Sequence, residues 1–158
     1  MSSNNEIHEL FKVAEVELIY RKNKNAIQPI VSSAPAAYRL LRSCWNRNRI
    51  DLVEEFKILL LDRKKACIGV SDISSGGTSS TVVDNKIIFA TALKANASSI
   101  VLVHNHPSGN LEPSESDLIA TRRLVEVSKT LGIPLLDHMI VAEGGFLSIR
   151  ERHPAYFR

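Results

Sequence analysis

Residues 99–117 read SIVLVHNHPSGNLEPSESD and hold the most informative pattern in the chain. Residues 99–104 form a short apolar segment, which is typical of a strand buried on both faces of a sheet. Pro-Ser-Gly at 107–109 ends this strand with a turn. A helix is expected next over 114–131, with Gly132 as its stop. A buried strand followed by a helix predicts a sheet with helices packed on it.

The rest of the sequence extends this pattern in both directions. In chain order we expect a strand over 12–20, a helix over 34–45, a hairpin of 56–61 and 66–70, a helix from a cap at Asp84 to Ala95, the strand and helix above, and a last hairpin of 134–141 and 146–149. This order predicts an α/β (α+β) fold with a single mixed β-sheet flanked by helices. We expect 1–10 to be a flexible terminus, 11–50 to pack on the domain as a strand and a helix, and 51–158 to form the core of one domain overall.

Composition places the chain among ordinary globular proteins and sets several functional classes aside. Its 158 residues are 44% hydrophobic and 23% charged, with a net charge of +3, which falls short of the dense basic face of a dedicated nucleic-acid binder. No apolar run reaches the roughly 18 residues that a membrane span needs, and the N-terminus is polar. Cys44 and Cys67 belong to no CxxC motif, so we expect two buried free thiols in a reducing cytoplasm.

His104 and His106 have the spacing of metal ligands. Side chains two apart on a strand project to the same face, so the two imidazoles can reach one point. The turn after Pro107 lets the chain return with Asp117 in the first turn of the next helix. Two histidines and a carboxylate leave one corner of a tetrahedral zinc site open, as in catalytic zinc sites, where the pKa of water falls to about 7. We therefore expect one zinc ion per chain; the alternative is that the histidines only pack.

Ser114 and a glutamate complete the predicted site. Ser114 lies one helical turn before Asp117, so its hydroxyl could stabilise an oxyanion in the same cavity. The same spacing is also that of a capping box, and the two interpretations are compatible because a cap would fix Asp117. For the base we look for a carboxylate that enters an apolar strand, and both Glu54 and Glu55 precede such a strand.

The spacing His104-x-His106, seven residues, then Ser114-x-x-Asp117 resembles the signature of JAB/MPN+ (JAMM) metalloproteins. HNHPSG at 104–109 is similar to their RadC-type branch, and the likeness covers about residues 50–150. The resemblance implies a JAB/MPN (cytidine-deaminase-like) architecture. It makes His104, His106 and Asp117 the zinc ligands and Ser114 the oxyanion residue. Glu54 fits the branch's Glu-x-Phe spacing as the acid/base, with Glu55 as the alternative.

The function implied by the resemblance is a zinc-dependent hydrolase of peptide or isopeptide bonds, a JAMM-type metallopeptidase with a protein or peptide substrate. The alternative is a non-catalytic zinc-binding accessory protein linked to DNA repair or mobile-element maintenance. That alternative rests on the DNA-repair label of RadC-type proteins and on the mild positive charge. Residues 1–50 are too few for the helix-hairpin-helix DNA module of longer RadC-like chains, and residues 83–86 read VDNK where the branch often has His-Pro-Arg-Glu.

Three further features have two interpretations each. The resemblance makes Asp137-His138 a pair that could steer a metal ligand, although a histidine with satisfied hydrogen bonds at a strand entrance is the plainer interpretation. Basic residues within 21–24, 47–49 and 63–65 could contact phosphates, but charged turns are usually solvated. The Ser/Gly segment 74–80 is either a lid over the site or a connector.

Overall fold

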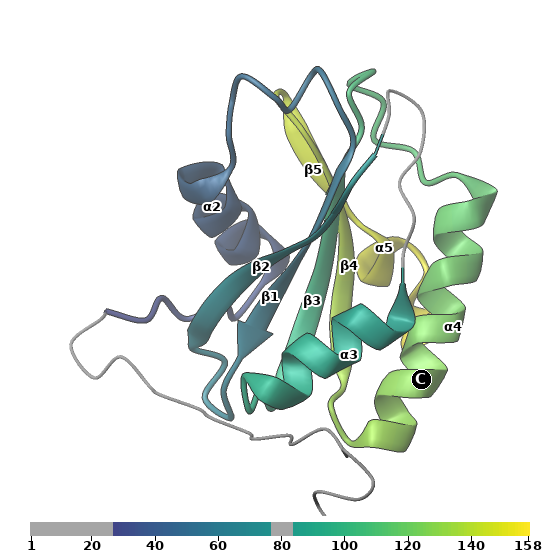
Figure 1. Cartoon of the computed structure of the whole chain (residues 1–158). Helices are drawn as coiled ribbons and strands as arrows, with labels where there is room; N and C mark the ends of the chain where they lie inside the picture. The colour runs from purple at the N-terminus through teal and green to yellow at the C-terminus, as the bar shows by residue number, and fades with distance from the viewer. Residues whose placement is uncertain (1–26, 77–83) are drawn as a thin grey trace, which may run out of the picture.

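The computed structural model describes residues 27–76 and 84–158, whose strands form one five-stranded sheet (Figure 1). In chain order the strands are β1 (Glu55–Leu61), β2 (Cys67–Ser75), β3 (Ser99–Asn105), β4 (Leu135–Ala142) and β5 (Gly145–Ser148). Their order across the sheet is β2-β1-β3-β4-β5. Strands β3 and β4 run parallel, and the other neighbouring pairs are antiparallel. The sheet is therefore mixed, which confirms the predicted α/β class.

Helices cover both faces of this sheet. They are α2 (Ala34–Cys44), α3 (Asn85–Lys94), α4 (Glu115–Leu131), α5 (Ile149–Arg152) and the 3-10 helix η1 (Pro154–Phe157). Helix α2 packs on one face, whereas α3 and α4 pack on the other (Figure 1). Helix α4 is the crossover that the parallel pair β3 and β4 requires. None of the helices in the described ranges is long and apolar enough to cross a bilayer.

Short local signals fix where the longer helices begin and end. Ser33, Asp84 and Ser114 each accept a hydrogen bond from a backbone N–H in the first turn of the helix that follows. Such caps satisfy N–H groups that have no partner within the helix. Helix α4 ends at Gly132, whose φ of 67° is a left-handed conformation that glycine adopts without a steric penalty. The boundaries predicted for these three helices are confirmed.

Strand β3 is buried along its whole length, as its apolar sequence predicts. Its side chains alternate between two core clusters. Leu102 packs in the cluster beneath α3 and α4, and Val103 packs in the cluster beneath α2. By the same alternation His104 lies on the α3 and α4 side of the sheet, and Asn105 lies on the α2 side. The last four positions of this strand therefore point alternately to the two faces of the sheet.

Some elements differ from the prediction, and others fall outside the residues that the structure describes. Strand β2 is longer than predicted and continues to Ser75, so the start of the predicted loop 74–80 is part of a strand. Helices α5 and η1 were not predicted, because each has four residues and is held by tertiary contacts with β4 and α4. Four of the predicted features lie outside the described residues. They are the strand over 12–20, the flexible terminus, the basic residues at 21–24 and the loop from 77 onward.

Both cysteines are free, as predicted. Cys67 is buried, but Cys44 is exposed, so the prediction of two buried thiols is wrong for Cys44. The buried side of α2 runs through Ala37 and Leu41, and Trp45 continues it after one further turn. The side chain of Cys44 lies beside that buried stripe rather than on it.

Candidate metal centre

The structure brings together the three residues predicted as ligands. His104 Nε2 lies 3.0 Å from His106 Nε2 and 3.3 Å from Asp117 Oδ1. His106 Nε2 lies 3.6 Å from Asp117 Oδ2. One ligand atom from each residue lies within 4.8 Å of the others. His104 is buried, whereas His106 and Asp117 are partly exposed, so the group is accessible from solvent on one side.

The local backbone explains this convergence. His104 belongs to β3 and faces α4, and His106 follows directly after the end of the strand. Gly109 has a φ of 77°, a left-handed conformation that favours glycine and helps the chain to reverse. The returning chain enters α4 at its Ser114 cap, which puts Asp117 in the first helical turn. A strand end and a helix start thus supply the three side chains.

A backbone carbonyl fixes the tautomer of His106. His106 Nδ1 lies 2.6 Å from the carbonyl oxygen of Asn110. A carbonyl oxygen can only accept a hydrogen bond, so Nδ1 carries the proton. In the neutral ring Nε2 then keeps its lone pair, and Nε2 is the atom that faces Asp117.

A chain of hydrogen bonds fixes the tautomer of His104. Thr121 Oγ1 donates to the backbone oxygen of Asp117 at 2.6 Å and lies 2.6 Å from His138 Nδ1. Because the hydroxyl proton is already donated, His138 Nδ1–H donates to Thr121 and His138 Nε2 can only accept. His138 Nε2 lies 3.0 Å from His104 Nδ1, which therefore carries a proton. His104 Nε2 is left as the lone pair that faces the other ligands.

Contacts within the ligand group shift the pKa values of its members. Burial raises the pKa of Asp117, but the hydrogen bond from Ser114 and those that His104 and His106 donate from Nε2 when their rings are protonated outweigh it and hold that pKa well below its usual range. Only the protonated ring of His106 can donate a hydrogen bond from Nε2 to Asp117, so this contact favours the protonated form and raises the pKa of His106. Burial lowers the pKa of His138 well below its usual value, so His138 is neutral at pH 7. A carboxylate and two imidazole nitrogens that point at one spot are a donor set that fits a divalent ion such as zinc.

Ser114 lies against the ligand group and forms the capping box. Its Oγ donates to Asp117 Oδ2 at 2.6 Å and accepts the N–H of Asp117 at 3.1 Å. The N–H of Ser114 donates to the same carboxylate oxygen at 2.7 Å. The capping interpretation is thus confirmed, and the cap holds Asp117 beside the histidines. The oxyanion role of Ser114 stays a prediction.

The two candidate bases differ in position. Glu55 Oε1 pairs with Arg49 Nε at 2.8 Å, and its Oε2 lies 3.6 Å from Lys57 Nζ. Lys57 in turn lies over the Trp45 ring, in the cluster beneath α2, so Glu55 points to the face opposite the ligands. Glu54 is close enough to His106 for its charge to contribute to the raised pKa of that ring. Glu54 is therefore the carboxylate of the pair on the ligand side.

Asp137 and His138 are neighbours in sequence that serve opposite faces of β4. His138 contacts His104, as the steering interpretation requires. Asp137 instead accepts hydrogen bonds from Ser148 Oγ at 2.6 Å and from the N–H of Arg150 at 3.1 Å, away from the ligands. Thr121 was not predicted as part of the site, although its position one helical turn after Asp117 places it on the same side of α4.

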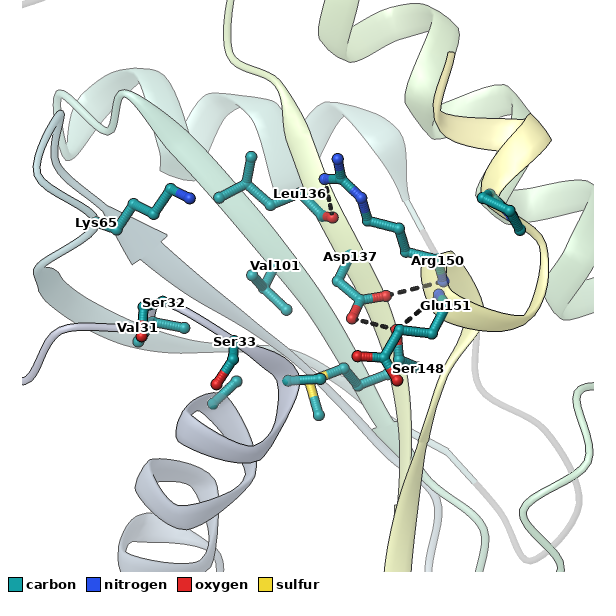
Figure 2. Close-up of a pocket in the computed structure, with 14 residues that line it drawn as sticks. Val31, Ser32, Ser33, Lys65, Val101, Leu136, Asp137, Ser148, Arg150 and Glu151 are labelled. Atoms are coloured by element: carbon teal, nitrogen blue, oxygen red, sulfur yellow. Dashed lines mark hydrogen bonds between the residues drawn. The ribbon is translucent and has the colours of Figure 1, made fainter.

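A cavity of about 440 Å³ lies on the α2 face of the sheet (Figure 2). It is lined by residues from the start of α2, from β3 and β4 and from the β5–α5 junction. Figure 2 shows Asp137 in this cavity with its bonds to Ser148 and Arg150. His104 and His138 face the other side of the sheet, so the cavity is separate from the ligand group.

A mixed sheet flanked by helices, with two histidines and an aspartate gathered near the end of its central strand, is the arrangement that the resemblance to JAB-type proteins implies. The chain belongs to the RadC-like JAB domain family, whose sequence model matches residues 31–154. The predicted RadC-type branch is thereby confirmed.

Two similar proteins illustrate the extent of the likeness. A UPF0758 protein of Syntrophomonas wolfei is 48% identical over 99 residues, which cover 63% of this chain and 42% of the relative. The UPF0758 protein tlr1707 of Thermosynechococcus vestitus is 39% identical over 148 residues, which cover 91% of this chain and 57% of the relative. The chain thus spans about half the length of these curated relatives.

Proposed function

We propose that this chain is a zinc-dependent hydrolase of peptide or isopeptide bonds. The observation that carries the proposal is the convergence of His104, His106 and Asp117, with one ligand atom of each within 4.8 Å of the others. Each imidazole has its Nδ1 engaged in another hydrogen bond and its Nε2 turned to the common point. A merely packed histidine has no need of this arrangement, whereas a metal ligand does.

Each residue of the site has a separate role in the proposed reaction. His104, His106 and Asp117 would hold the ion, which supplies a Lewis acid that polarises a carbonyl and lowers the pKa of water. Glu54 accepts a proton from the attacking water and delivers it to the leaving amine. Ser114 turns its hydroxyl from Asp117 to the oxyanion that forms at the carbonyl. The substrate is a protein or peptide, and the two free cysteines fit a reducing compartment such as the cytoplasm.

Elemental analysis tests the metal site first. Protein purified without added metal is expected to contain close to one zinc per chain, and His104→Ala and Asp117→Ala are expected to lose it. His153→Ala is the matched control, because His153 stacks on Tyr156 away from the ligands. Less than about a tenth of an equivalent of zinc in the unsubstituted protein contradicts the proposal.

Hydrolysis is tested with a peptide library. The zinc-loaded protein is incubated with the library and cleaved products are identified by mass spectrometry, with Glu54→Gln protein run in parallel. Cleavage by the unsubstituted protein alone supports the proposal. A zinc-loaded protein that cleaves neither peptides nor isopeptide-linked conjugates contradicts the hydrolase assignment.

A further inference from the structure

Asn105 stands between the two histidines in sequence, but its side chain serves the other face of the sheet. The residue is fully buried. Its Oδ1 accepts the N–H of Glu55 at 2.7 Å, and its Nδ2 donates to the carbonyl oxygens of Ile50 at 2.6 Å and Val53 at 2.9 Å. Asn105 thus ties the segment that precedes β1 to the end of β3.

These bonds hold the backbone on both sides of Glu54. The carbonyl of Val53 belongs to the peptide group before Glu54, and the N–H of Glu55 belongs to the peptide group after it. Because each peptide group is planar, only the φ and ψ angles of Glu54 lie between them. Asn105 therefore restrains both angles through one side chain. A further bond, from the N–H of Gly76 to the Glu54 carbonyl at 2.9 Å, holds the same residue from the position that follows β2.

The restrained residue is next to the metal ligands. Phe56, two residues after Glu54, pairs with His104 in the β1–β3 ladder, and the two rings stack with centroids 6.0 Å apart. The restraint from Asn105 therefore acts where β1 meets the ligand strand. A side chain that only filled the core beneath α2 would be apolar, as Val103 is, and would leave the backbone before β1 without these partners.

We propose that Asn105 is a positioning residue, which directs the carboxylate of Glu54 toward the group formed by His104, His106 and Asp117. The inference rests on the proposed function, because that function gives Glu54 its proton-transfer role. Asn105 itself touches no reacting atom. It acts through the backbone, and its position between the ligands lets one short segment place both the ligands and the base.

Hydrogen exchange on the metal-free protein tests the restraint. In the unsubstituted protein the Glu55 amide proton and the Asn105 side-chain amide protons should be protected. Asn105→Asp keeps the shape but cannot donate to the two carbonyls, and Asn105→Ala removes all three bonds. Both should raise exchange within residues 50–55 at least about tenfold more than within the centres of β1 and β3. Val103→Ala is the matched control, because it weakens the same core but removes none of the three Asn105 bonds, and it should raise exchange evenly.

The visible spectrum of the cobalt-loaded protein tests the consequence for Glu54. Glu54→Gln is expected to move the midpoint of the pH-dependent spectral change, and Asn105→Ala, which adds no charge of its own, should move it in the same direction. The double variant should move it no further than Glu54→Gln alone, because both changes act through one carboxylate. Val103→Ala should keep the original midpoint.

Two results overturn the inference. One is an exposed, fast-exchanging Asn105 side-chain amide in the unsubstituted protein. The other is an original spectral midpoint in an Asn105→Ala protein that exchanges faster at 50–55, because the restraint would then be structural only. A protein that binds no cobalt refutes the proposed function and the role of Glu54, whereas the exchange measurement still decides whether Asn105 holds the segment.

Discussion

The rings of His104 and His138 are in direct contact, with 3.0 Å between Nδ1 of the first and Nε2 of the second. His138 is buried in β4, and His104 is buried in the neighbouring parallel strand β3. The contact leaves Nε2 of His104 as the atom that faces His106 and Asp117. Metal affinity and stability in acid should therefore both depend on this pair.

Loss of the Thr121 hydroxyl should weaken metal binding. Thr121→Val keeps the shape but removes the acceptor for His138 Nδ1–H, so neither ring is held in its tautomer. Changes of this kind typically cost 10–100-fold in metal affinity, and we expect about tenfold in a competition titration with a chromophoric chelator. Thr130→Val is the matched control, because Thr130 makes the same type of bond to the carbonyl four residues before it on the same helix but is exposed. Equal affinities of the two variants would contradict the role given to Thr121.

The metal-free protein should lose stability in acid partly through His138. Its folded-state pKa lies well below 6.5, so as pH falls below 6.5 the unfolded chain binds this proton first and the free energy of unfolding decreases. The contribution is at most about 1.4 kcal/mol per pH unit. His138→Gln, which cannot titrate, should lose less stability in urea between about pH 6.5 and about pH 5.5.

Three other titratable residues lie around His138 and are kept in both proteins of this comparison, namely His104, His106 and Asp117. His106 has a raised pKa, so its stabilising contribution is complete below 6.5 and is lost as pH rises through its folded-state pKa. Asp117 has a lowered pKa, and its contribution is lost only in strong acid. The difference in the pH dependence of unfolding between the two proteins therefore reports the titration of His138. Equal losses of stability between about pH 6.5 and about pH 5.5 in both proteins would contradict this role of His138.

Glu54→Gln and Glu55→Gln should separate catalysis from stability. Glu54→Gln should retain zinc and lose at least about a hundredfold in the rate of peptide cleavage, because general acid–base groups contribute that much or more. Glu55→Gln should retain the rate but lower the urea midpoint, because Glu55 pairs with Arg49 and with the buried Lys57. The reverse pattern would move the base to Glu55.

Asp117 has two roles that a pair of variants should resolve. Asp117→Asn retains an oxygen for the N–H of Ser114 but removes the charge, and Asp117→Ala removes both. Both should lower zinc affinity at least about tenfold, and the alanine variant should lose about 1 kcal/mol more stability in the metal-free state because the capping box is broken. Zinc affinity within twofold of the unsubstituted protein in both variants would exclude Asp117 as a ligand.

Local patterns were sufficient to predict much of the fold and the convergence of the ligand group. The apolar run before His104, the cap at Ser114 and the stop at Gly132 each act within a few residues, so they can be read without knowing the rest of the chain. The alternation of a strand also explains why His104 and His106 share a side.

Features that depend on contacts between distant segments were not predictable in this way. Glu54 and Glu55 differ only in which face of β1 they approach, and a shift of one residue in the start of a strand exchanges those faces. The bonds from Asn105 join positions about fifty residues apart in sequence. The contact between His138 and His104 requires the register of β3 with β4, which only the folded sheet establishes.

The alternation of His104, Asn105 and His106 across the sheet makes this tripeptide intolerant of changes in length. Deleting or inserting a single residue there would turn the amide into the ligand group and an imidazole into the core beneath α2. A substitution at one of these positions changes one side chain. A deletion or insertion of one residue would remove the metal ligands and the support for Glu54 together.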